Sequence, residues 1–334
     1  MSSAPTIVQA DALAWLAANA APAHASVVTS LPDRSEIAGA SFDAWQTWFH
    51  RAVRAILAWL PEGGVAIFYQ TDVRHDEVWV DKGQLVMSAA EAESMSLVWH
   101  KIVCRRPAGT ANPEGRPSYS HLVCLAREAR APRRPSPDVL LAAGPPDATR
   151  AMGFAVCQLV CDYLRHETAT RCVVDPCCGT GSVLAVASAL GFDVIGVELN
   201  AKRCRAARTM IAKVTALHQA VVAGARAFDR GAFFEAHEVW EDHWRIAEDE
   251  AERRGVQGLI QAAAAFHKLF EMRGPESAAR LLGRALAKLD ATAWLPGFEL
   301  ARFRSELHAC ACALEAGTLA RSDVPRLLHP RGEA

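Results

Sequence analysis

A glycine loop near the middle of the chain carries the clearest chemical signal in the sequence. A β-branched apolar run leads into Asp175, and a Gly-x-Gly turn follows at Gly179 and Gly181. Glycine lets the backbone pass close to a ligand where a Cβ would collide, and the helical segment that comes next, 183–190, begins with free N–H groups. The order of strand, loop and helix therefore predicts a ligand-binding loop.

An acidic residue stands where a ribose would be bound. The next predicted strand, 192–197, ends at Glu198. A carboxylate at the tip of the second strand is the usual partner of ribose hydroxyls in such a crevice. A dinucleotide fingerprint would need a third glycine, but Leu184 occupies that position. These residues favour a nucleoside-containing cofactor and argue against nicotinamide or flavin.

At this loop the chain resembles the S-adenosylmethionine-dependent methyltransferases. Their first motif is acidic-x-x-x-Gly-x-Gly, and the variant Asp-Pro-x-Cys-Gly-Thr-Gly at 175–181 is most similar to that of methyltransferases acting on nucleic acid, RNA in particular. The resemblance implies S-adenosyl-L-methionine as cofactor, with the loop on its methionine end and Glu198 on its ribose. The residues it assigns to cofactor binding are Asp175, Pro176, Cys177, Gly179, Thr180, Gly181, Ser182 and Glu198.

A second polar cluster follows an early apolar strand. This strand begins at Ser26 and stops at Pro32, because proline cannot continue the hydrogen-bond ladder. The polar residues there lie at the strand's carboxyl end, where open α/β sheets place their sites. The cluster precedes the glycine loop, an order that resembles the circularly permuted amino-methyltransferases over about 20–215.

In that family a Ser/Asp/Asn-Pro-Pro-aromatic motif accepts the hydrogens of the target amine and stacks on the base. The matching residues, expected to be catalytic, are Ser30, Leu31, Pro32 and Asp33. Ser30 and the Leu31 carbonyl would accept hydrogen bonds, and Asp33 would accept a proton or orient the nucleophile. Alternatively, Asp33 and Glu36 cap a turn that begins the next helix.

The fourth position of this motif is not aromatic, so a stacking surface must come from elsewhere. The candidates are Tyr69, Trp79, Trp99 and Tyr119. If none of them serves, the target is not a flat base.

The hydrophobic patterning predicts the elements that position both clusters. Further strands are expected at 65–69, 97–104 and 121–126, and helices at 7–20, 42–60, 149–164 and 201–217. The tryptophans of the 42–60 helix are expected in the core. We therefore predict an α/β fold with a Rossmann-like methyltransferase sheet and permuted motif order over 1–215, followed by an all-α bundle over 216–330.

Charge is balanced overall but not locally. The 334 residues carry a formal net charge of -1, which selects no partner. Between Lys101 and Arg134 there are eight Lys/Arg against two Glu, so the local balance is 8 − 2 = +6. This segment is either a solvated loop or a face that binds the phosphates of a nucleic acid.

The cysteines favour thiols in a reducing cytoplasm. Ten cysteines show no evenly spaced framework and no Cys-x-x-Cys pair, so we expect no metal site. Cys177 and Cys178 are expected to be small packed residues of the loop. No basic leader precedes an apolar run near Met1, and no uncharged apolar run reaches the ~20 residues that span a bilayer. We expect no membrane association.

The helical region opens with Phe-x-x-His-Glu-x-Trp-Glu-x-x-Trp at 234–244. A zinc-protease site needs His-Glu-x-x-His, but position 241 is Glu and His243 lies on another helix face. The segment resembles domain of unknown function family 309 over about 228–290, which names no partner. Its polar residues would line a pocket or form a buried network, and they are His237, Glu238, Trp240, Trp244, Gln261 and Lys268.

From the two resemblances we expect an S-adenosyl-L-methionine-dependent N-methyltransferase acting on a nucleobase. RNA, with transfer RNA as an example, is preferred over DNA. The alternatives are a DNA amino-methyltransferase, a non-catalytic cofactor-binding adaptor that works through its helical domain, and a methyltransferase of small molecules or proteins.

Overall fold

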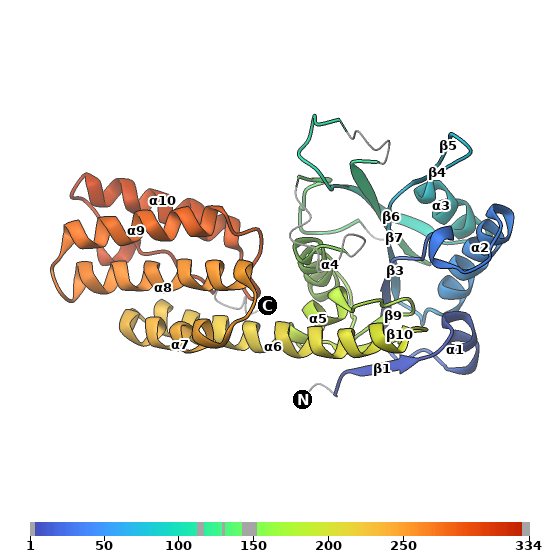
Figure 1. Ribbon diagram of the computed structural model, residues 1–334, viewed down its shortest axis with the longest axis horizontal. Helices are drawn as coiled ribbons and strands as arrows, with labels where there is room; N and C mark the ends of the chain where they lie inside the picture. The colour runs from blue at the N-terminus through green and yellow to red at the C-terminus, as the bar shows by residue number, and fades with distance from the viewer. Residues whose placement is uncertain (1–3, 112–116, 129–130, 142–151, 329–334) are drawn as a thin grey trace. The chain divides into compact units, whose positions relative to one another are not determined.

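The chain divides into two compact units, Met1–Lys213 and Val214–Ala334. The computed structural model describes residues 4–111, 117–128, 131–141 and 152–328 (Figure 1). None of the described helices combines the length and the apolar composition needed to cross a membrane. The predicted domain boundary at 215 falls inside a single helix, α6 (Ala201–Asp229).

An eight-stranded sheet forms the centre of the first unit, in the order β1-β10-β9-β2-β3-β7-β6-β8. The strands are β1 (Thr6–Gln9), β2 (Ala25–Thr29), β3 (Val65–Gln70), β6 (Ser96–Cys104), β7 (Tyr119–Ala126), β8 (Val139–Leu140), β9 (Cys172–Asp175) and β10 (Asp193–Glu198). Neighbouring strands are parallel except where β7 runs antiparallel between β3 and β6. The carboxyl ends of β2, β3, β6, β9 and β10 therefore share one edge.

Helices cover both faces of this sheet (Figure 1). α1 (Ala12–Ala18), α2 (Phe42–Trp59) and α3 (Lys82–Ala92) lie on one face, and α4 (Phe154–Glu167), α5 (Ser182–Ala189) and the start of α6 lie on the other. From the pair β9–β2 the chain moves outward in opposite directions, through α5 to β10 and through α2 to β3. Because crossovers are right-handed, their helices lie on opposite faces and leave a crevice between β9 and β2.

α2 shows why the sequence pattern predicted a helix. The Ser41 hydroxyl caps its first turn by accepting a hydrogen bond from the Ala44 N–H at 3.2 Å. Trp45 and Phe49 are fully buried against the sheet. The core position predicted for the tryptophans of this segment is thus confirmed for Trp45.

The structure corrects the predicted start of the fold. We expected a helix over 7–20, but Thr6–Gln9 form β1, which pairs with β10 at the sheet edge, and α1 begins only after Asp11 caps it. Four residues are too few for a strand signal, and β10 supplies the ladder that orders them. The helix predicted over 149–164 is α4; residues 149–151 lie outside the described ranges.

Several elements were not predicted. These are α3, the short β8 and a separate hairpin of β4 (Val73–His75) and β5 (Val78–Val80). The strands predicted over 97–104 and 121–126 are confirmed as β6 and β7.

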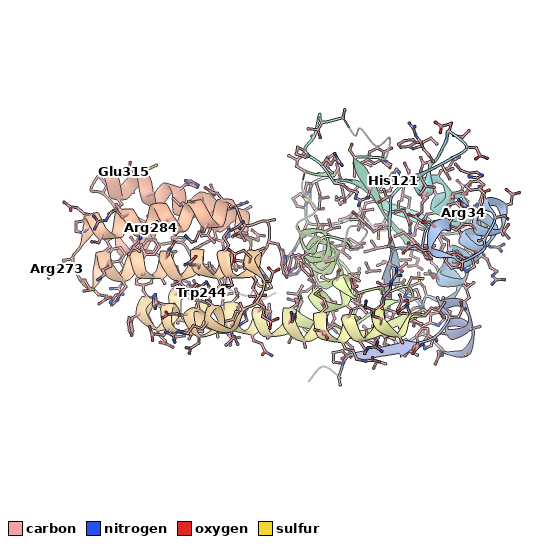
Figure 2. The ribbon with its side chains drawn as sticks, in the orientation of Figure 1. Arg34, His121, Trp244, Arg273, Arg284 and Glu315 are labelled. Carbon is pink, nitrogen blue, oxygen red and sulfur yellow. The ribbon has the colours of Figure 1, made fainter. Side chains whose placement is uncertain are left out.

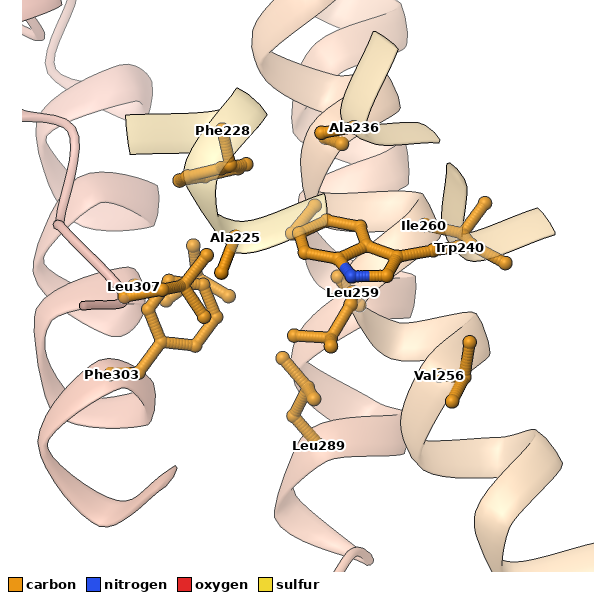
Figure 3. Close-up of a cluster of buried hydrophobic side chains, with 14 of the residues drawn as sticks. Ala225, Phe228, Ala236, Trp240, Val256, Leu259, Ile260, Leu289, Phe303 and Leu307 are labelled. Carbon is orange, nitrogen blue, oxygen red and sulfur yellow. The ribbon is translucent and has the colours of Figure 1, made fainter. Parts of the chain in front are cut away.

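The second unit is a helical bundle, as predicted. Its helices after α6 are α7 (Phe233–Ile246), α8 (Glu250–Phe270), α9 (Pro275–Asp290) and α10 (Leu300–Glu315). Figure 3 shows Trp240 among Phe228, Leu259 and other apolar side chains. The indole N–H of Trp240 donates to the Val221 carbonyl at 3.2 Å, so the one polar atom of this ring is satisfied inside the core.

The polar residues of the 234–244 motif and of α8 are dispersed. Trp240 lies in the core, His237 bonds to Glu238 at 3.1 Å, and the Lys268 ammonium contacts the Met272 sulfur at 3.1 Å. Apart from the His237–Glu238 contact, no hydrogen bond among the described residues joins the six side chains for which we predicted a shared pocket or network.

Two helical glycines give a matched test of packing in this bundle. A Cβ at Gly224 would overlap the Trp240 indole, whereas a Cβ at Gly283 would meet nothing within 4 Å. Gly224→Ala should therefore destabilise the bundle by about 1–3 kcal/mol through overpacking. Gly283→Ala should stabilise it by about 0.5–1 kcal/mol, because alanine loses less backbone entropy in a helix. Urea unfolding followed by circular dichroism measures both, and equal signs would contradict the packing around Trp240.

Candidate functional site

A buried hydrogen bond joins the ends of β2 and β9 at the base of the crevice between these strands. The Thr29 hydroxyl donates to Asp175 Oδ1 at 2.7 Å, and the Cys177 N–H donates to the same oxygen at 3.1 Å. The Thr29 and Asp175 side chains are both buried. Burial raises the pKa of Asp175 to about 7, although these two donors oppose the rise. Asp175 thus holds the loop onto the neighbouring strand.

The two glycines of the loop serve different purposes. Both have positive φ, 53° at Gly179 and 81° at Gly181, which side chains rarely adopt. A Cβ at Gly181 would come within 2.9 Å of the Ala207 Cβ on α6, so glycine is needed there for packing. A Cβ at Gly179 would meet nothing within 4 Å. The backbone at Gly179 therefore borders open space that a ligand can enter.

Glu198 secures the far side of this loop. Its carboxylate accepts hydrogen bonds from the Gly179 N–H at 3.1 Å and from the Asn200 N–H at 2.8 Å. At the start of α5 the buried Ser182 hydroxyl has no hydrogen-bond partner among the described residues. An open glycine backbone, a carboxylate and an unpartnered hydroxyl suit a polar ligand with a ribose.

The structure therefore brings together every residue for which we predicted cofactor binding. Pro176 and the Cys178 thiol are buried in the loop, whereas Cys177 and Thr180 are half-buried. Burial raises the pKa of the Cys178 thiol, which suits a packed residue better than a nucleophile. The binding roles themselves stay predictions.

The predicted catalytic turn after β2 is held by a buried lysine. The Lys82 ammonium, at the start of α3, donates to Asp33 Oδ1 at 2.6 Å and to the Leu31 carbonyl at 3.4 Å. The Lys82 side chain is only 3% exposed, whereas that of Asp33 is 27% exposed. The Trp45 indole N–H donates to the Pro32 carbonyl at 3.1 Å. The Leu31 carbonyl, predicted to accept from a substrate amine, and Asp33, predicted to accept a proton or orient the nucleophile, thus already share one internal donor.

The capping alternative for Asp33 also has support. A 3₁₀ turn, η1 (Arg34–Glu36), follows directly, and the Glu36 carboxylate accepts from the Asp33 N–H at 3.2 Å. The Asp33 backbone therefore takes part in a cap while its side chain faces Lys82 and solvent.

A cavity of about 400 Å³ opens beside this turn. Its walls come from the end of β2, the segment after β3, α3 and the residue after β6, and they include Ser30, Asp33, Thr71, Asp72, Lys82 and Arg105. A cavity of this size suits a nucleoside-sized group. The glycine loop and the cavity therefore occupy the two sides of the β9–β2 crevice.

Asp72 is the most heavily hydrogen-bonded carboxylate that our sequence reasoning missed. It accepts from the Lys82 N–H at 2.9 Å, the Trp79 indole at 3.1 Å, the Tyr119 hydroxyl at 3.3 Å and His121 Nε2 at 3.1 Å. Burial favours the neutral acid, but these donors outweigh it and lower the pKa of Asp72. The only sequence signal was its place directly after a buried strand.

A second histidine extends this network (Figure 2 labels His121). His121 Nδ1 lies 3.0 Å from His100 Nε2. Burial would lower the pKa of His121, but the Asp72 carboxylate raises it overall, whereas burial and the nearby His121 lower the pKa of His100. The raised pKa of His121 and the lowered pKa of His100 agree with a charged His121 that donates a hydrogen bond to a neutral His100.

Among the residues that the structure describes, two groups of side chains have donor sets that could hold a metal ion. In one, donor atoms of Asp72, Asp81 and His121 lie within 4.8 Å of one another. The other consists of His237, Glu238 and Glu241 on the surface of α7. In the first group, Asp72 already accepts hydrogen bonds from four protein donors. The contacts of Asp72 in this group are therefore those of a hydrogen-bonded cluster.

The stacking candidates fall into two pairs. Tyr69 and Trp99 are buried in the sheet region, so neither reaches the cavity, and Trp79 and Tyr119 donate to Asp72. The aromatic rings that line the cavity are Phe42 and Trp45. Phe42 stacks on His75, which also lines the cavity, with ring centroids 4.0 Å apart and planes at 13°. No local pattern indicated this pair, because the β4–β5 hairpin that carries His75 was not predicted.

Three of the described basic residues in the 101–134 segment donate to backbone carbonyls. The buried Lys101 ammonium donates to the Pro137 carbonyl at 2.9 Å, Arg127 donates to the Leu57 carbonyl at 3.0 Å, and Arg133 donates to the His166 carbonyl at 3.2 Å. Arg116 and Arg130 lie outside the described residues. Of the described basic residues in this segment, Arg105 lines the cavity.

Comparisons with known proteins follow the division into two units. Residues 221–281 match the family described as Domain of unknown function (DUF309), in agreement with the predicted resemblance of the helical region. No curated protein sequence matches the chain.

Solved structures match the α/β part. A protein of Thermus thermophilus, provisionally described as a DNA modification methylase, superposes with a TM-score of 0.51 at 17% identity over 64% of this chain and 96% of that one. The same protein complexed with S-adenosyl-L-methionine gives 0.51 at 15% identity over 64% and 95%. The similarity confirms the Rossmann-like methyltransferase fold, while the circular permutation stays a prediction.

The Lys82–Asp33 pair predicts a coupled stability effect. Lys82→Met should destabilise the chain by about 1–3 kcal/mol, because a buried pair loses one partner while Asp33 keeps part of its hydration. Asp33→Asn should cost less in the Lys82→Met background than alone. Urea unfolding of the four variants of this double-mutant cycle gives the coupling energy. If the losses of unfolding free energy in the two single variants simply add in the double variant, a stabilising Lys82–Asp33 ion pair is contradicted.

Asp175 predicts a pH-dependent stability difference. Its pKa of about 7 in the fold exceeds the ordinary value of 3.8, so the folded state binds a proton more tightly and this residue's contribution to stability falls as pH rises from about 4 to about 7. Asp175→Asn removes this loss. The variant should therefore gain stability relative to the parent over that window, by at most about 4 kcal/mol. Parallel curves of unfolding free energy against pH would refute the raised pKa.

Proposed function

We propose that the first unit is an S-adenosyl-L-methionine-dependent methyltransferase that acts on an amine of a nucleobase. The observation that carries this proposal is the crevice at β9–β2. There the open backbone at Gly179 and the cavity beside Ser30 lie on opposite sides of the Thr29–Asp175 hydrogen bond. Ligands of open α/β sheets bind where the strand order reverses in this way.

The glycine loop is the cofactor side of this site. The open backbone at Gly179 would approach the methionine end, the unpartnered Ser182 hydroxyl would hydrogen-bond to it, and Glu198 would face the ribose. The bound cofactor supplies an electrophilic methyl group carried on sulfur. Asp175 acts indirectly, since its described hydrogen bonds hold the loop against β2.

The turn after β2 is the substrate side. An exocyclic base amine is a weak nucleophile, because its lone pair is delocalised into the ring. Ser30 accepts a hydrogen bond from this amine. Forming the N–C bond breaks the bond between the methyl group and sulfur, whose electron pair stays on sulfur, and the solvent-facing part of the Asp33 carboxylate accepts the proton that the amine then loses. Lys82 keeps the Asp33 side chain in place, and the walls of the cavity exclude water while the amine is aligned with the methyl group.

The substrate class is nucleic acid, with DNA at least as well supported as RNA. The structural neighbour is described as a DNA modification methylase. The preference for RNA rests on the resemblance of the 175–181 motif, and transfer RNA has no support from the comparisons. The helical unit matches DUF309, a similarity that names no activity for it.

Incubation with radiolabelled S-adenosyl-L-methionine and separate pools of small RNA, ribosomal RNA, single-stranded DNA and duplex DNA tests this proposal. We expect label in one nucleic-acid pool. Asp33→Ala should lower transfer at least about 100-fold, the usual contribution of a positioned acid or base. Its affinity for the cofactor, measured by calorimetry, should match that of the parent.

Two outcomes would overturn parts of the proposal. Equal transfer by Asp33→Ala would remove Asp33 from the chemistry. Cofactor binding without label in any pool would favour the non-catalytic adaptor or a small-molecule substrate. The adaptor alternative is supported by Lys82, whose ammonium already donates hydrogen bonds to the Leu31 carbonyl and to Asp33.

A further inference from the structure

The polynucleotide backbone needs a cationic surface near the cavity, and part of the predicted one is unavailable. Lys101 and Arg127 donate to carbonyl groups of the first unit, and the Lys101 side chain is buried. Both side chains would have to leave these contacts to reach a phosphate. Arg133 also donates to a carbonyl group, but its side chain is 82% exposed and does not line the cavity.

Three other arginines line the cavity instead. Arg34 belongs to η1, Arg74 to β4 and Arg105 follows β6, and all three are exposed. Figure 2 shows Arg34 in the first unit. Arg34 and Arg74 form no ion pair with any residue in the described ranges. The fold therefore gathers three guanidinium groups from segments far apart in sequence around one opening.

The acidic groups of the same cavity do not cancel this charge. Asp33 is paired with Lys82 at 2.6 Å, and Asp72 is buried among its four donors. Glu36 lies 3.4 Å from Arg203. Asp33 and Glu36 thus have cationic partners and Asp72 is buried, while the side chains of Arg34, Arg74 and Arg105 are exposed.

We propose that Arg34, Arg74 and Arg105 form an arginine rim that binds the phosphodiester backbone of a single-stranded polynucleotide whose base enters the cavity. This inference rests on the proposed function and specifies how its substrate is held. Guanidinium groups bind phosphate oxygens through two parallel hydrogen bonds, which fixes the strand as well as attracting it.

The walls below the rim suit a base rather than a phosphate. Phe42 and His75, whose rings stack on each other, line the same cavity as Arg74, and Ser30 and Asp33 line it with hydrogen-bond acceptors. A base inside a duplex cannot reach such acceptors without leaving its stack, which costs a few kcal/mol. A single strand avoids this cost and should bind more tightly than a duplex.

Fluorescence anisotropy with labelled mixed-sequence oligonucleotides tests the rim. The parent protein and the variants Arg34→Ala, Arg74→Ala, Arg105→Ala and their triple combination are titrated with single-stranded RNA, single-stranded DNA and duplex DNA at several salt concentrations. Arg106→Ala is the matched control, because Arg106 is exposed and adjacent to Arg105 but does not line the cavity.

We expect the triple variant to bind single strands at least about tenfold more weakly at low salt. Its slope of log K against log salt should be shallower by about 2, since each lost phosphate contact removes ~0.7. Each single variant should show part of this loss of affinity and slope, and Arg106→Ala should retain the slope of the parent. The RNA and DNA arms then show which sugar the site accepts.

The rim is wrong if the triple variant keeps the affinity and slope of the parent, or if Arg106→Ala loses as much. Tighter binding to duplex than to single strands would also overturn it. The proposed function fails separately, when the parent protein binds or methylates no nucleic acid. Circular dichroism and cofactor affinity of the triple variant confirm that any loss does not come from unfolding.

Discussion

The buried hydrogen bond between Thr29 and Asp175 is the contact on which the rest of the first unit's site depends. It joins β2 to β9 where the order of the sheet reverses, and it fixes the separation of the two segments that leave these strands. Removing either partner would leave a buried polar group unsatisfied, which costs about 1–3 kcal/mol. The position of the glycine loop relative to the turn after β2 is therefore set by the sheet rather than by loop conformations.

Lys82 fixes the end of β3 relative to the end of β2 in the same way. Its N–H binds Asp72 after β3, and its ammonium binds Leu31 and Asp33 after β2, so one residue at the start of α3 ties two strand ends together. A buried cation is expensive unless it is paired, and the carboxylate and carbonyl around it provide that pairing. The cavity is thus rigid at its floor, and its exposed arginines lie at the opening.

The two units divide the chemistry of the chain. The α/β unit holds both polar clusters for which we predicted function, with strand ends that converge on one edge. The helical unit has its own core around Trp240, whose indole N–H is satisfied internally.

Sequence alone determined the parts of this protein that depend on local pattern. The glycine loop, the carboxylate after the next strand, the helix over 42–60 and the helical bundle could all be predicted, because backbone geometry and hydrophobic period are local properties. The tertiary structure decided the rest. Asp72 after β3, His121 in β7 and Arg105 after β6 are far apart in the chain and come to one end of the sheet because β7 inserts antiparallel between β3 and β6. A side chain's partners depend on strand order, which no local pattern encodes, and for this reason Lys101 became a loop anchor while Arg34 and Arg74 reached the cavity.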